Sequence, residues 1–155
     1  METNQSISSK LANIAIATGI SILIVAINIA IFTNLFPFYD TKIAAKNIPW
    51  KQVVMGLTIS PLGEELIFRL IPISLFKTLT KSSPQIFEES KWYAIAIIAC
   101  VFGYIHGGYY NIFIQGIAGF AFGWVYIKNG MSYWSAVITH FLYNFMIYVI
   151  FPTII

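Results

Sequence analysis

The sequence predicts an all-α membrane protein, a polytopic helical bundle of about five spans with the second span kinked or broken. Of its 155 residues, 58% are hydrophobic and only 10% are charged, whereas charged residues make up about a quarter of an ordinary soluble domain. Five long apolar stretches, at residues 11–36, 52–76, 92–107, 110–127 and 133–151, use up most of the chain. Each is near the length that crosses a bilayer as a helix.

The first stretch is expected to be a retained span, because it is longer than the core of a signal peptide and has no clear small-x-small cleavage site. Residues 1–51 are then an N-terminal tail, a first span and a loop that carries Asp40, Lys42 and Lys46. Residues 52–155 form the membrane core.

The second stretch contains two prolines. Ser60 followed by Pro61 predicts that a helix restarts there, with Ser as the cap and Pro at the first helical position. Pro72 predicts a further bend. The charged and turn-forming residues that follow are expected in a loop before the third span: Lys77, Lys81, Pro84, Glu88, Glu89 and Lys91.

The remaining connections and glycines support the same division. Lys128, Asn129 and Gly130 predict a tight turn between the fourth and fifth spans. Glycines four residues apart lie in the third span, at Gly103 and Gly107, and in the fourth, at Gly119 and Gly123 with Gly116 nearby. They predict that these two helices pack closely.

Charge and cysteine content exclude some functions. The formal charge of +3 comes without a basic run or a basic helix face, so nucleic acid is not expected as a partner. The single cysteine, Cys100, allows no internal disulfide and no thiol metal cluster. The expected partners are the lipid bilayer and a membrane-associated peptide or protein.

Two acids and an arginine lie in the middle of the second stretch. Each would cost about 2.5–3.5 kcal/mol at the centre of a membrane helix, so they must be paired or hydrated. Glu65 and Arg69 are four residues apart and share a helix face, which predicts an ion pair. Glu64 points elsewhere without a local cation, and is the candidate general base or acid.

The only two histidines also lie in apolar stretches. Phe102 and His106 share one face of the third span, and His140 and Asn144 share one face of the fifth. If spans two, three and five converge, Glu64 is a base, His106 is a second proton carrier, and His140 and Asn144 are donors for a developing oxyanion. These are the parts needed for attack of water on a peptide carbonyl.

A metal site is the competing chemistry. Glu64, His106 and His140 could supply the three ligands that catalytic zinc prefers. The sequence lacks the His-Glu-x-x-His helix of zinc proteases. Metal-free activation of water is the preferred interpretation, and a divalent metal such as zinc stays open as a cofactor.

Three segments resemble, in order, the motifs of the CPBP family of CAAX prenyl proteases and bacteriocin-processing or immunity-linked proteins, also called the Abi family. The segments are EELIFR at residues 64–69, FGYIH at residues 102–106 and HFLYN at residues 140–144. The resemblance implies an all-helical membrane core and an intramembrane endopeptidase. In it Glu64 and His106 would activate water, His140 and Asn144 would hold the oxyanion, and Glu65 and Arg69 would support the site.

The sequence departs from the family pattern at one motif position and in its number of spans. Leu70 stands where the family often has glycine, and the chain has fewer spans than many members. A partner subunit or a homo-oligomer would then supply the missing wall. Many short members are prokaryotic, so a multi-pass protein of the prokaryotic cell membrane is expected. The alternative function is a non-catalytic immunity or scaffold protein that uses the same polar cavity to bind a peptide.

Overall fold

The computed structural model describes residues 5–35 and 49–150. The predicted loop with Asp40, Lys42 and Lys46 therefore lies outside the described residues. The described part is helical and contains no strand, which confirms the all-α prediction.

Five helical stretches follow one another along the chain. The first is α1 (Ile7–Leu35). The second joins α3 (Trp50–Glu65), a π-helical turn η1 (Leu66–Leu70) and α4 (Ile71–Leu79), and the third is α5 (Pro84–Ile105). The fourth joins α6 (Tyr109–Asn111), a π-helical turn η2 (Ile112–Gly116) and α7 (Ile117–Lys128), and the fifth joins α8 (Tyr133–Phe145) to a π-helical turn η3 (Met146–Ile150).

Three of the helical stretches are long and apolar enough to cross a membrane: Ile7–Ile27, Tyr109–Lys128 and Tyr133–Ile150. The second and third stretches do not meet this criterion, although both were predicted as spans. The second contains Glu64, Glu65 and Arg69, and α5 carries Glu88, Glu89 and Lys91 in its second turn. The charged side chains that lower the hydropathy of the second stretch are the same ones that the sequence pattern places in the candidate site.

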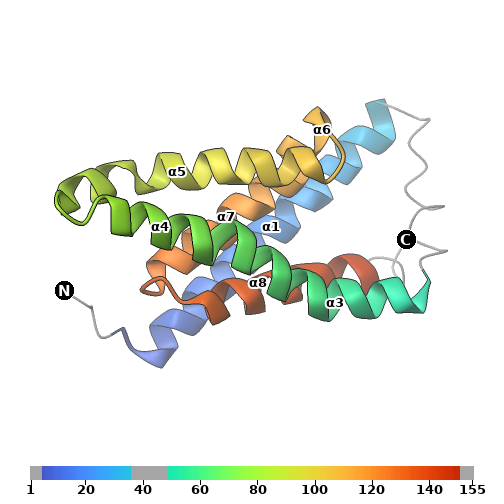
Figure 1. Cartoon of the computed structure of the whole chain (residues 1–155). Helices are drawn as coiled ribbons and strands as arrows, with labels where there is room; N and C mark the ends of the chain where they lie inside the picture. The colour runs from blue at the N-terminus through green and yellow to red at the C-terminus, as the bar shows by residue number, and fades with distance from the viewer. Residues whose placement is uncertain (1–4, 36–48, 151–155) are drawn as a thin grey trace.

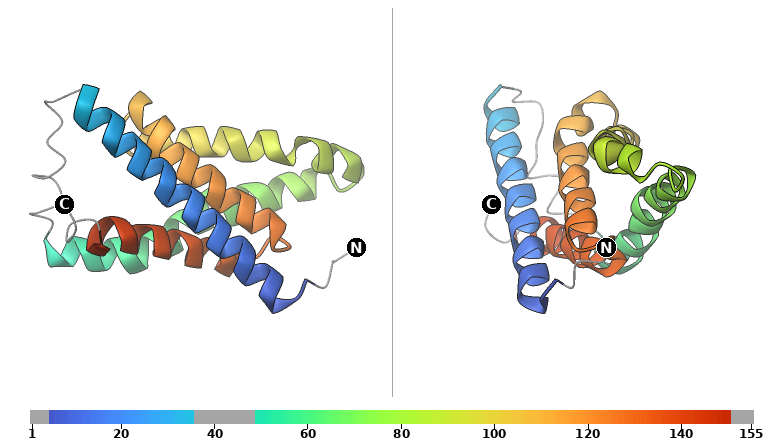
Figure 2. Two further views of the ribbon diagram at one scale, coloured as in Figure 1. Left: turned by 180° about the vertical axis from the view of Figure 1, so that it is seen from behind. Right: turned by 90° about the vertical axis from the view of Figure 1, so that its left-hand side faces the viewer.

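Helix α7 lies in the middle of the bundle. It packs against α1 on one side and α5 on the other, and α8 contacts α1, α3 and α7 (Figure 1). Viewed from behind, α1 runs alongside α7 and crosses α8 diagonally (Figure 2). The π-helical turn η1 at the end of α3 contacts both α5 and α8, so the convergence of spans two, three and five that the predicted site requires is present.

Small residues allow α7 to approach α5 closely. A Cβ atom at Gly123 would lie 2.6 Å from a methyl group of Ile95, and one at Gly103 would lie 2.7 Å from the backbone nitrogen of Gly116. The predicted glycine contact between spans three and four is therefore present. Gly107 does not take part in it, because it lies beyond α5 in a turn with φ of 150°.

The predicted helix restart at Ser60 and Pro61 is wrong. Pro61 is inside α3, where its missing N–H costs one hydrogen bond but does not end the helix. Neighbouring helices make such a proline tolerable in a membrane bundle. The irregularity occurs five residues later, at the π-helical turn Leu66–Leu70, so Glu64 and Glu65 lie at the end of α3 and not at a new N-terminus.

The predicted loop between the second and third spans is shorter than expected. Pro84 begins α5, at the position where proline's fixed φ suits a helix. Glu88, Glu89 and Lys91 therefore lie on α5. The predicted turn at Lys128–Gly130 is confirmed: α7 ends at Lys128, and Ser132 caps α8 by accepting a hydrogen bond from the Ser135 N–H.

Candidate active site

The end of α3 and the π-helical turn after it provide the buried ion pair. Arg69 Nη1 lies 3.1 Å from Glu65 Oε1, and the two side chains are 1% and 0% exposed. The pair predicted from the four-residue spacing is therefore present. Its burial means that each charge depends on the other, because neither is hydrated by bulk water.

Arg69 is also held by the third and fourth helical stretches. Its Nη2 donates a hydrogen bond of 2.8 Å to the carbonyl of Gly119 on α7. Its guanidinium carbon lies 4.6 Å from the centre of the Phe102 ring and 5.5 Å from that of Phe122, distances at which aromatic rings attract a cation. Arg69 thus joins η1 to α5 and α7, and the Phe102 ring lies against its guanidinium.

His140 on α8 is fixed by the same ion pair. Its Nδ1 lies 2.8 Å from Glu65 Oε1, and its ring stacks on Phe122 at 4.5 Å between centroids. A carboxylate paired with a guanidinium only accepts hydrogen bonds, so the Nδ1 atom carries the hydrogen. The Nε2 atom of the neutral ring is therefore the one with a free lone pair, and it lies 3.8 Å from Glu64 Oε2.

His106 is oriented in a similar way by backbone. It follows the last residue of α5, and its Nδ1 lies 2.7 Å from the carbonyl oxygen of Phe102. A carbonyl is an acceptor, so here too Nδ1 carries the hydrogen and Nε2 is free in the neutral ring. That Nε2 lies 3.4 Å from Glu64 Oε2.

Glu64 is the point where these groups converge. Its Oε2 faces Nε2 of both His106 and His140, and its side chain is 24% exposed, in contrast to the fully buried Glu65. Two imidazoles from two other helical stretches face Glu64, which is the arrangement on which the site predicted from the sequence depends. Glu64 Oε2 and the two Nε2 atoms all carry lone pairs. Their approach to one another therefore requires at least one proton or hydrogen-bond donor between them. The cluster is therefore suited to binding and moving a proton.

Asn144 lies one turn beyond His140 on α8, but it contacts a different group. Its Nδ2 donates a hydrogen bond of 2.8 Å to the carbonyl of Gly56 on α3. An amide nitrogen has two hydrogens, so this bond leaves one of them for another acceptor. Asn144 thus joins α8 to α3, and within the described residues no hydrogen bond links it to Glu64 or to either histidine.

Sequence reasoning missed two residues of this site. Gly119 accepts the hydrogen bond from Arg69, and a Cβ atom there would lie 2.8 Å from both Arg69 Nη2 and Phe102 Cδ1. Phe122 covers His140 and lies over Arg69. The spacing of Gly119 and Gly123 indicated close packing, but nothing in it indicated an arginine as the neighbour.

The donor types around Glu64 suit a divalent metal, since both imidazoles present Nε2 and have Nδ1 held by another group. The placement of the side chains does not fit one as they stand. In residues 5–35 and 49–150, no group of three or more His, Cys, Asp or Glu side chains is arranged to hold a metal ion.

Comparison with known proteins identifies the family. Residues 46–146 match the family model of the type II CAAX prenyl endopeptidase Rce1-like proteins. No curated protein and no solved structure matched the chain. The matched range contains Glu64, Glu65, Arg69, Phe102, His106, His140 and Asn144 and leaves α1 outside. The chain therefore belongs to the Rce1-like family of CAAX-protease-type intramembrane endopeptidases, and is an integral membrane protein.

Proposed function

We propose that this protein hydrolyses a peptide bond in a membrane-associated protein or peptide, using water activated by Glu64 and His106. The observation that carries the proposal is the approach of Glu64 Oε2 to the Nε2 atoms of His106 and His140, at 3.4 and 3.8 Å. A carboxylate beside an imidazole can accept a proton from water and return it to a leaving group.

The proposed reaction has two steps. The oxygen of water attacks the carbonyl carbon of the peptide while its proton passes to the pair of Glu64 and His106. The tetrahedral intermediate then collapses, the carbon–nitrogen bond breaks, and the proton moves to the leaving amine. The products are a new amine and a new carboxylic acid, which keeps the second proton of the water until it ionises to the carboxylate, and no further reactant is consumed.

His140 and Asn144 are proposed to stabilise the oxyanion. His140 in its protonated form would donate from Nε2, since its Nδ1 is bonded to Glu65. Asn144 would donate the second hydrogen of its amide, the first being bonded to the Gly56 carbonyl. Glu65 and Arg69 act through His140 and are positioning residues.

The experiment uses purified protein in lipid vesicles and two peptides that end in the same CAAX sequence, one farnesylated and one unmodified. The parent should cleave in water labelled with oxygen-18 and place one labelled oxygen in the new carboxylate. Glu64→Gln should lose a factor of about 10² to 10⁴ in rate, the range of general acid–base catalysis.

The matched control is Glu89→Gln, which makes the same chemical change at an exposed site on α5. It should cleave at the parent's rate. Cleavage by Glu64→Gln at the parent's rate would remove the acid from the mechanism. Comparison of the two peptides shows whether a prenyl group is required, and we propose that the unmodified peptide is also cleaved.

The alternative chemistry is zinc-dependent hydrolysis, for which Glu64, His106 and His140 would have to move from their present placement to become ligands. It draws support from the two Nε2 atoms that face Glu64, because histidine ligands commonly have the other ring nitrogen held. Elemental analysis and a chelator test on the same active preparation decide between the two. Stoichiometric zinc with cleavage that a chelator abolishes would favour the metal over our preferred mechanism.

A further inference from the structure

A second polar feature lies where α4 meets α5, and its lining includes none of the residues proposed for peptide hydrolysis. A cavity of about 450 Å³ is lined by Lys77, Lys81, Phe87 and Glu88, together with Thr78, Thr80 and Pro84. We refer to it as the α4–α5 pocket. It is unrelated to the groups proposed for peptide hydrolysis.

The α4–α5 pocket is positively charged. Lys77 and Lys81 are one helical turn apart and exposed, and within the described chain neither has an acid at ion-pair distance. Glu88, the only acid of the lining, is already paired with Lys91. Two ammonium groups are therefore available to an anion.

Other groups of the lining also favour the binding of an anion at the two lysines. The hydroxyls of Thr78 and Thr80 donate to carbonyls of their own helix, so the ammonium groups are the principal donors. The pocket also includes Pro84, the first residue of α5, and the Ser83 side chain caps no N–H there. The N-terminal end of a long helix has a partial positive charge that favours an anion.

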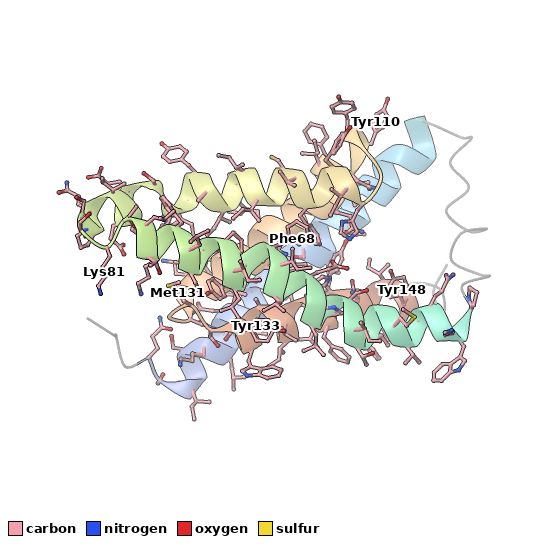
Figure 3. The ribbon with its side chains drawn as sticks, in the orientation of Figure 1. Phe68, Lys81, Tyr110, Met131, Tyr133 and Tyr148 are labelled. Carbon is pink, nitrogen blue, oxygen red and sulfur yellow. The ribbon has the colours of Figure 1, made fainter. Side chains whose placement is uncertain are left out.

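The position of the pocket indicates what kind of anion it binds. Lys81 lies at the same end of the bundle as Met131, in the turn between α7 and α8 (Figure 3). Phe87, which lines the pocket, belongs to a core cluster against which Met131 packs. Because α7 and α8 are membrane-spanning stretches joined by that turn, this end of the bundle lies at a membrane surface.

Exposed apolar side chains flank the charges. Leu79, at the end of α4, is 72% exposed, and Ile86, near the start of α5, is 51% exposed. Cationic donors next to apolar surface fit a molecule with a phosphate head and acyl tails. Free phosphate would contact the cationic donors and leave the apolar surface without a partner.

We propose that the α4–α5 pocket binds the phosphate headgroup of an anionic phospholipid from the surrounding bilayer, with Lys77 and Lys81 as its main contacts. The acyl chains of this lipid lie along Leu79 and Ile86. A lysine at a membrane surface favours anionic lipid enough that loss of both should lower the preference at least tenfold.

The test measures which lipids stay bound to the purified full-length protein. Protein in detergent is mixed with equal amounts of phosphatidylglycerol and phosphatidylcholine that have the same acyl chains, and retained lipids are counted by native mass spectrometry. The parent should retain phosphatidylglycerol preferentially. Lys77→Gln with Lys81→Gln should reduce that preference at least tenfold, and the two Lys→Arg changes should preserve it.

The control is Lys51→Gln with Lys128→Gln, which removes the same charge at exposed positions outside the pocket. It should bind lipid as the parent does. Equal retention by the pocket variant and the parent would overturn the proposal. So would competition by inorganic phosphate at these lysines without any preference for phosphatidylglycerol, because the occupant would then be a soluble anion. Neither result depends on peptide cleavage.

Discussion

Substitution of Gly119 by alanine tests how tightly the buried arginine is packed. An added Cβ atom would lie 2.8 Å from Arg69 Nη2 and 2.8 Å from Phe102 Cδ1, shorter than real Cβ contacts. Arg69 and Phe102 are each 1% exposed. Neither can therefore move into open space, and the Gly119 carbonyl must lose its short bond to Arg69.

The expected cost has two parts. Overpacking of a core costs about 1–3 kcal/mol, and a hydrogen bond to a charged group is worth about 1.5–3 kcal/mol. Because relief of the clash breaks the bond, these contributions overlap, and we expect a loss of about 2–4 kcal/mol. For a chain of this size that corresponds to roughly 5–15 °C in Tm.

The assay is thermal unfolding of the purified protein in detergent. The control is Gly19→Ala on α1, where an added Cβ meets nothing within 4 Å. Alanine favours a helix over glycine by up to about 1 kcal/mol, so this control should unfold at or above the parent's temperature. Equal Tm values for Gly119→Ala and Gly19→Ala would refute the packing described around Arg69.

Two further predictions concern side chains with contrasting roles. Asn144→Ala should lower stability by about 1–3 kcal/mol in the same unfolding assay, because the Gly56 carbonyl loses the hydrogen bond from the Asn144 amide. Unchanged Tm with reduced cleavage would assign Asn144 to the reaction alone. Glu65→Gln should destabilise by about 3–5 kcal/mol, because it leaves Arg69 as an uncompensated buried charge. The partly exposed Glu64 gives the matched comparison: Glu64→Gln should change Tm much less, and a similar loss for both acids would contradict the division of roles.

Local geometry accounts for what the sequence predicts correctly in the site. Residues four apart on a helix share a face, so the pair of Glu65 and Arg69 follows from spacing alone. The Phe102 and His106 pair is a further case, with ring centroids 4.3 Å apart. The all-α membrane fold follows from composition and from the lengths of the apolar stretches.

The rest depends on contacts between helices, which spacing does not encode. The placement of Gly119 under Arg69 requires the packing of α7 against η1 and α5, and the bond from Asn144 to Gly56 requires the contact of α8 with α3. Local signals also misled: Ser60 and Pro61 carry the features of a helix start, yet the tertiary environment keeps Pro61 inside α3. The meeting of Glu64 with the two imidazoles could be stated from the sequence only as a condition, because His140 comes from α8 and His106 from the end of α5.

The central claim is that Glu64 and His106 act on one water molecule as a unit. The most direct measurement is a double-mutant cycle on the cleavage rate, with the parent, Glu64→Gln, His106→Gln and the double variant compared on the same peptide. Residues that act together are strongly non-additive, so we predict that the double variant is about as slow as the slower single variant. A double variant whose loss equals the product of the two single losses would contradict the claim.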